Sequence, residues 1–107
     1  MTDGAITVTH LVDRERFRAE VEEDGSPVEV GFIDYTSDSG YADGDRLALT
    51  HTVIFDRFGG RGYAGQLVRQ VLDQIRADGN KVIPVCSYVT SYLEKHPEYA
   101  DLVVSSS

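Results

Sequence analysis

The sequence predicts an α/β fold: a mixed, twisted sheet of about five strands with two main helices, in the order βββ-α-β-α. Three observations predict it. The first half of the chain alternates apolar and polar residues with a period of two, the middle joins a buried strand to a helix through glycines, and the last third repeats the strand–helix pair. At 107 residues the chain is expected to form one domain spanning 1–107.

The N-terminal half is predicted to form antiparallel strands. Residues 6–10 form either a short first strand or a loosely held lead-in. Over 16–23 the charges would also suit a helix, but Phe17, Ala19 and Val21 alternate with charged residues, which favours a strand. The turn at 24–27 then leads into a strand at 28–35, followed by a polar loop at 36–45.

The stretch from Leu47 to Gly79 organises the rest of the chain. A strand over 46–55 is rich in apolar and β-branched residues, as expected when both faces are covered. A helix is predicted over 61–78, ended by Gly79. Its apolar residues recur at helical spacing, at Ala64, Leu67, Val68, Val71, Leu72 and Ile75.

A second strand–helix pair follows, with a strand at 81–86 and a helix at 88–96 that Pro97 stops. The strand at 81–86 is expected to lie parallel to the strand at 46–55, through a right-handed crossover. Pro84 cannot donate a ladder hydrogen bond, so it belongs on an edge strand or where two strands part.

Composition restricts the class of function. Ten basic and eighteen acidic residues give a net charge of −8, which disfavours nucleic acid as a partner and favours cations such as amines, although acidity serves solubility equally well. No apolar run reaches membrane-spanning length, and Met1–Gly4 lacks the features of a signal peptide. The single cysteine fits the reducing cytoplasm. No metal site is expected.

The glycines between the central strand and its helix predict an anion site. Gly59, Gly60 and Gly62 let the backbone turn tightly and leave no Cβ in the way of a ligand. The N–H groups that begin a helix lack partners and carry partial positive charge, and Arg57 and Arg61 add attraction. A tight turn without a ligand is the open alternative.

One motif in this turn is a false match. Residues 60–65 spell GxGxxG, but the dinucleotide fingerprint needs an acidic residue near the end of the next strand, and residues 81–86 contain none. The dinucleotide-binding interpretation is therefore rejected.

The run Gly60-Arg61-Gly62-Tyr63-Ala64 resembles the acyl-CoA motif of the GNAT N-acetyltransferase superfamily, (Gln/Arg)-x-x-Gly-x-(Gly/Ala). Its context is more specific. His51-Thr52, the glycine turn and Cys86-x-Tyr88-Val89-x-x-Tyr92-x-x-x-His96-Pro97 stand at distances that resemble the small, single-domain, acetyltransferase-like branch of that superfamily, over residues 16–103.

The resemblance implies a GNAT-like fold, acetyl-CoA as cofactor and an amine as acceptor. It places the diphosphate on the glycine turn, at Gly59, Gly60, Arg61, Gly62, Tyr63 and Ala64. It also implies that two parallel strands splay apart and that the pantetheine arm bonds to the backbone at Val53, Ile54 and Phe55. A tyrosine on the last helix is often the general acid in this superfamily, which makes Tyr92 the first candidate here and Tyr88 the second.

Cys86 and His51 are two further side chains that could take part in catalysis. Cys86 stands where a strand hands over to a helix, where a thiol can have a lowered pKa and act as a nucleophile, although free cysteines are commonly buried apolar groups. His51 could act as a base, but in an apolar strand we expect a hydrogen-bonded structural histidine.

The chain departs from the resembled pattern in three ways. Val53 stands where a glutamate that could act as base is common, and Gly59 replaces a polar residue. The chain ends soon after the last helix, so the acceptor site is expected to be open or completed by a partner, such as the second copy of a homodimer. The leading hypothesis is direct acetyl transfer to an amine. The alternatives are a catalytically weak CoA-binding or protein-interaction module, and a covalent route through acetyl-Cys86.

Overall fold

The computed structural model describes residues 6–104. Ten short elements follow one another along the chain. In order, they are β1 (Thr7–Leu11), the 3-10 turn η1 (Val12–Arg14), β2 (Arg16–Glu23), β3 (Ser26–Asp38), β4 (Arg46–Ile54), η2 (Asp56–Phe58), α1 (Tyr63–Ala77), β5 (Lys81–Pro84), α2 (Ser87–Lys95) and η3 (Pro97–Leu102). The α/β fold with a mixed five-stranded sheet is confirmed. Met1–Gly4, considered above for a leader, lies outside the described residues.

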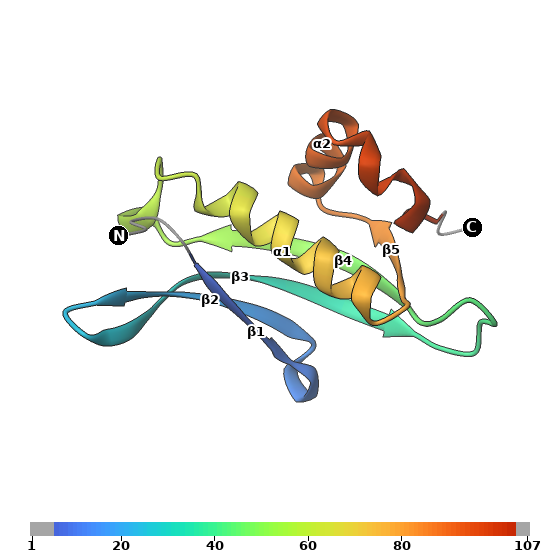
Figure 1. Ribbon diagram of the computed structural model, residues 1–107, viewed down its shortest axis with the longest axis horizontal. Helices are drawn as coiled ribbons and strands as arrows, with labels where there is room; N and C mark the ends of the chain where they lie inside the picture. Colours follow the sequence, from blue (N-terminus) through green and yellow to red (C-terminus); the bar gives the residue numbers. More distant parts are fainter. Residues whose placement is uncertain (1–5, 105–107) are drawn as a thin grey trace.

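The sheet has the order β1-β2-β3-β4-β5 (Figure 1). The first four strands are antiparallel neighbours, and β5 lies parallel to β4, as expected for a strand–helix–strand unit. Residues 7–11 form a full strand paired with β2, so four antiparallel strands precede the glycine turn, and the lead-in interpretation is wrong.

One face of the sheet carries the core. Buried side chains alternate along the strands and meet the apolar stripe of α1, with Val89 of α2 in the same cluster. The fully buried large side chains include Phe17, Ile33, Leu49, Leu67, Leu72 and Ile75. On the other face Arg16 pairs with Asp34 at 2.6 Å and lies over the Phe32 ring, and these side chains stay partly exposed.

Several element boundaries differ from the expected ones. α1 begins at Tyr63 and not at Arg61, because Gly62 has a φ of 79°, outside the helical region. β5 ends at Pro84, two residues early, since Val85 and Cys86 both donate their N–H to the Leu49 carbonyl. α2 spans Ser87–Lys95, and β3 extends to Asp38, into the expected loop.

α1 ends as predicted, with Gly79 in the left-handed region at a φ of 76°. Val103 follows η3 and makes one parallel bridge to Val82, on the outer side of β5. No helix among the described residues is long and apolar enough to cross a membrane.

Candidate active site

The turn between β4 and α1 is held open by its glycines. Gly60 and Gly62 have φ values of 77° and 79°, in the region where residues with a Cβ are strained. A Cβ on either glycine would meet nothing within 4 Å. Packing therefore does not explain why the turn lacks side chains here, and the space above its backbone is open.

A run of backbone N–H groups faces that space without acceptors. Within residues 6–104, the N–H groups of residues 60–65 donate no hydrogen bond, and the helical ladder starts with Gln66 N–H to Gly62 O at 3.3 Å. Gly59 differs from its neighbours, because its N–H already donates to the Asp56 carbonyl at 3.1 Å. The Tyr63 side chain is buried, so that residue offers its N–H alone.

The two arginines of the turn are used differently. Arg57 forms an ion pair with Glu23 at 2.7 Å, which ties the turn to the end of β2. Arg61 makes no ion pair among the described residues, and its guanidinium lies 5.6 Å from the centre of the Phe58 ring. Arg61 is therefore the cation of this turn that an incoming anion can engage directly.

β4 and β5 part next to the turn. Their pairing runs from Arg46 and Lys81 to Leu49 and Pro84, after which β4 continues to Ile54 with no partner on that side among the described residues. A register shift against β3, with Thr50 as the extra residue, falls at the same place. The predicted role of Pro84 is confirmed, since it ends an edge strand where two strands separate.

The unpaired half of β4 presents Thr52 and Ile54 to the gap. Phe55 donates its N–H to Val30 on β3 at 2.9 Å, and the Val53 carbonyl lies against Gly31 of β3, where a Cβ would approach to 2.1 Å. Backbone groups alternate in direction along a strand, so those of Thr52 and Ile54 face the opposite side. Of the expected pantetheine contacts, Ile54 alone has no backbone partner on this side within residues 6–104. The Val53 carbonyl and the Phe55 N–H are directed to β3, and the Phe55 carbonyl accepts the Phe58 N–H at 2.8 Å.

Cys86 closes the far side of the gap. It is the N-cap residue of α2, with φ −70° and ψ 133°, and its Sγ lies 3.5 Å from the Thr52 hydroxyl. Burial by itself raises the pKa of this thiol, but hydrogen bonds from the Thr52 hydroxyl and from the N–H groups of Val89, Tyr88 and Thr52 outweigh it. The net effect lowers the pKa of Cys86, so the site favours negative charge on sulfur.

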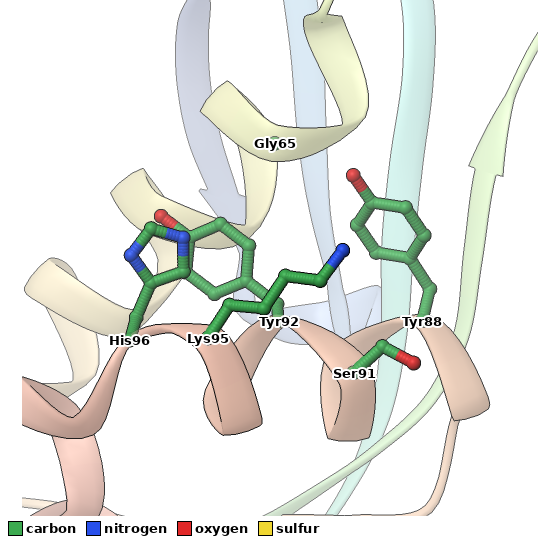
Figure 2. Close-up of a pocket in the computed structure, with 6 residues that line it drawn as sticks. All are labelled: Gly65, Tyr88, Ser91, Tyr92, Lys95 and His96. Carbon is green, nitrogen blue, oxygen red and sulfur yellow. The ribbon is translucent and has the colours of Figure 1, made fainter.

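α2 presents two tyrosines to a cleft beside α1 (Figure 2). The Tyr88 hydroxyl points toward Gly65, and the Tyr88 side chain is 42% exposed, which leaves it accessible. The Tyr92 ring stacks on His96 at a centroid distance of 4.0 Å, and burial raises its pKa. The Tyr92 hydroxyl is therefore protonated at neutral pH, whereas Tyr88 is nearer along α2 to Cys86.

His51 is exposed, contrary to the structural role expected for it. Its Nδ1 lies 3.2 Å from the Thr50 hydroxyl. Since it pairs with Asp34 and Val53 pairs with Phe32, both side chains belong to the face of the sheet opposite Cys86.

Thr52 is the site residue that sequence reasoning missed. It was noted within the His51-Thr52 pair and assigned no role, because a sequence does not show the register shift that turns its backbone toward Cys86. Sequence reasoning also did not place Lys95 beside the cleft that it lines, although its spacing of seven from Tyr88 puts both on one face of α2.

Comparisons with known proteins bear on the family and the fold of the chain. The family model described as GCN5-related N-acetyl-transferase matches residues 16–102. The solution structure of a GCN5-like protein from Staphylococcus aureus has a TM-score of 0.60 and 23% identity, covering 100% of this chain and 94% of that one. A ribosomal-protein-alanine N-acetyltransferase from Brucella melitensis biovar Abortus 2308 has a TM-score of 0.53 and 17% identity, covering 90% and 68%. Among curated proteins, no relative matches the chain.

Proposed function

Because the chain belongs to the GCN5-related N-acetyltransferase family, we propose that it transfers the acetyl group of acetyl-CoA directly to an amine. One observation carries this proposal: the N–H groups of residues 60–65, which have no acceptor within residues 6–104, lie next to the unpaired half of β4, with Cys86 across the gap. The first feature suits a diphosphate, and the second suits an amide-bearing arm.

Different residues of the site bind different parts of the cofactor. The N–H groups of Gly60, Arg61, Gly62, Tyr63 and Ala64 bind the diphosphate, with Arg61 adding charge. The pantetheine amides bond to the Ile54 backbone and to the Thr52 carbonyl, as a strand would, while the Thr52 N–H bonds to the Cys86 sulfur. The thioester then lies by Cys86, where the groups that lower the thiol pKa also stabilise negative charge on a departing sulfur.

The transfer step needs an amine nucleophile and a proton donor. A neutral amine attacks the thioester carbonyl, a C–N bond forms and the C–S bond breaks. The amine gives up a proton, and the CoA thiolate takes one from a tyrosine hydroxyl of α2. Tyr92 is the donor that the resemblance implies, and Tyr88 has the more exposed hydroxyl, so Tyr88→Phe and Tyr92→Phe decide between them. Val53 supplies no base, so the amine has to arrive neutral.

The proposal is tested in two steps. Calorimetry with CoA and with acetyl-CoA should show binding of both, because the glycine turn and β4 bind the nucleotide and the pantetheine that the two ligands share. Thiol release from acetyl-CoA should then depend on an added amine across a panel of lysine peptides and polyamines. Absence of binding at millimolar ligand would remove the proposal.

A second candidate function is a CoA-binding or interaction module without efficient catalysis. Val53 favours it, because no carboxylate stands where the resembled pattern places a base. Binding of acetyl-CoA without hydrolysis or transfer to any amine of the panel would select this candidate.

The covalent alternative has its own measurement. In that route the Cys86 thiolate attacks the thioester, CoA leaves, and an amine later takes the acetyl group from sulfur. Intact mass after incubation with acetyl-CoA would show an acetyl adduct that Cys86→Ala abolishes. Under direct transfer, we expect unmodified protein and amide product from the same mixture.

A further inference from the structure

His51 lies at the point where β4 leaves β5. The pairing of the two strands ends at Leu49, and Thr50 is the extra residue of the register shift against β3. The next residue, Thr52, brings its hydroxyl to 3.5 Å from the Cys86 sulfur. Side chains alternate along a strand, so His51 stands at the same end of the gap on the face that does not carry the core. This face is called the open face, and it includes Phe32, Asp34, His51 and Val53.

A chain of hydrogen bonds determines which ring nitrogen of His51 carries the hydrogen. The Thr50 hydroxyl donates to the Asp34 carbonyl at 3.1 Å, and His51 Nδ1 lies 3.2 Å from the oxygen of that hydroxyl. A hydroxyl has one hydrogen, so the Thr50 oxygen can only accept a hydrogen bond from the ring. Nδ1 therefore carries the hydrogen, and Nε2 is left with a lone pair that can accept a proton.

The Nε2 lone pair is accessible. His51 is exposed, and its Nε2 has no hydrogen-bond partner within residues 6–104. The neighbours of His51 on the open face offer no such group. Asp34, directly across on β3, is paired with Arg16 at 2.6 Å, and Val53 is apolar. Among the described side chains of this face next to the gap, His51 is therefore the one with an unoccupied proton acceptor.

We propose that the acceptor amine reaches the thioester from the open face and that Nε2 of His51 is the base that takes its proton. This inference rests on the proposed function, which places the thioester by Cys86 and requires the amine to give up a proton. The amine lone pair forms the C–N bond, the N–H proton passes to Nε2, and the C–S bond then breaks. The imidazolium keeps its Nδ1 hydrogen bond to Thr50 and releases the added proton to solvent.

A different explanation is that His51 is a solvated side chain on an exposed strand. Its removal would then change neither CoA binding nor the rate of transfer. Another is that the His51 ring maintains the shape of the gap, in which case its removal would weaken CoA binding. The three explanations are separated by measuring CoA affinity and turnover for the same variants.

The experiment compares the wild type with His51→Ala. Calorimetry gives the dissociation constant of CoA, and thiol release at saturating acetyl-CoA and amine gives kcat, after subtraction of the reaction without enzyme. The amine is the lysine peptide or polyamine on which the wild type is fastest. His51→Ala should bind CoA as the wild type does and should lower kcat by about 100-fold or more. Added imidazole should restore much of the lost rate in His51→Ala and should leave the wild-type rate unchanged.

Two threonine variants test the hydrogen bond that orients the ring. Thr50→Val removes the acceptor of the Nδ1 hydrogen, so the ring is no longer held in one tautomer, and kcat should fall by a smaller factor than in His51→Ala. Thr36→Val is the matched control, because Thr36 pairs with Ala48 away from the gap and its loss should leave kcat unchanged.

An unchanged kcat in His51→Ala, a loss that imidazole does not restore, or a loss explained by weaker CoA binding would overturn the inference and leave the proposed function standing. Absence of amine-dependent thiol release by the wild type would remove the proposed transfer and this inference with it. Thermal melting of each variant shows whether the fold is intact.

Discussion

The two halves of β4 have opposite surroundings within nine residues. From Arg46 to Leu49 the strand is paired with β3 on one side and β5 on the other, and Leu47 and Leu49 are buried at 4% and 0% exposure. From His51 to Ile54 its only strand partner within residues 6–104 is β3. The first half supports the core, and the second half leaves main-chain groups for a ligand.

The difference has local causes. The extra residue at Thr50 shifts the register against β3, and Pro84 ends the ladder of β5. Cys86 then caps α2, which carries the chain away from β4. An unpaired strand edge readily pairs with another strand. A ligand that hydrogen-bonds to the unpaired edge of β4 would occupy the position of such a strand.

Truncation in the paired half should have the largest effect. Leu49→Ala removes a fully buried side chain where β5 departs, and should lower the free energy of unfolding by about 3 kcal/mol. Val53→Ala, in the free half, should lower it by less than about 1 kcal/mol, because that side chain is partly exposed. Urea unfolding measures both. Equal losses would contradict the division of β4 into a core half and a ligand half.

A methyl group on the turn should act on the ligand more than on the fold. Gly62→Ala should cost about 1 kcal/mol of stability at its positive φ, and should weaken CoA binding by about tenfold or more through the Cβ over the N–H groups. Gly25→Ala is the matched control, at a φ of 81° with nothing within 4 Å of its Cβ. Calorimetry should show Gly25→Ala binding as the wild type does. A loss of affinity shared by both variants would place the effect in folding.

The pH dependence of Cys86 alkylation should report on the unpaired half of β4. A lowered pKa means that Cys86 is thiolate at a lower pH than a free cysteine, so its rate of alkylation by iodoacetamide should rise at lower pH than in the urea-unfolded chain. Thr52→Val removes a hydroxyl that stabilises the thiolate and should move the profile to higher pH. Thr36→Val, which pairs with Ala48 away from the gap, should leave it unchanged. A Thr52→Val profile that matches the wild type would show that the Thr52 hydroxyl does not stabilise the Cys86 thiolate.

The smallest effect is expected at Arg57. Its ion pair with Glu23 is largely exposed, so Arg57→Ala should lower the free energy of unfolding by less than about 1 kcal/mol. CoA affinity should fall a few-fold at low salt and converge with the wild type as salt rises. Arg61→Ala, which removes a cation that makes no ion pair within residues 6–104, is the comparison and should weaken binding more. The reverse order would assign the phosphate contact to Arg57.

Much of the fold could be predicted because its signals are local. The alternation at Phe17, Ala19 and Val21 fixed the type of β2 and its bounds at 16–23, and Gly79 marked the end of α1. The helix start at Tyr63 was missed because Gly62 takes a positive φ, which a helical spacing of apolar residues does not reveal.

The site was harder to predict, because it depends on register. The sequence indicated Gly60 and Gly62 and placed Cys86 at a helix start. It did not show that Thr52, and not Val53 or Phe55, turns its backbone to the gap, since that follows from one extra residue at position 50. The exposed position of His51 has the same cause. The assignments of Cys86 and Tyr92 as catalytic remain predictions.

The central claim is that one ligand spans the glycine turn and the unpaired half of β4. Amide ¹H–¹⁵N spectra recorded during a titration with CoA test it most directly. The account predicts that the largest shifts fall on residues 60–65 and on Thr52 and Ile54, while Leu47 and Leu49 in the paired half change little. Shifts absent at millimolar CoA, or confined to residues outside the turn and the gap, would contradict it.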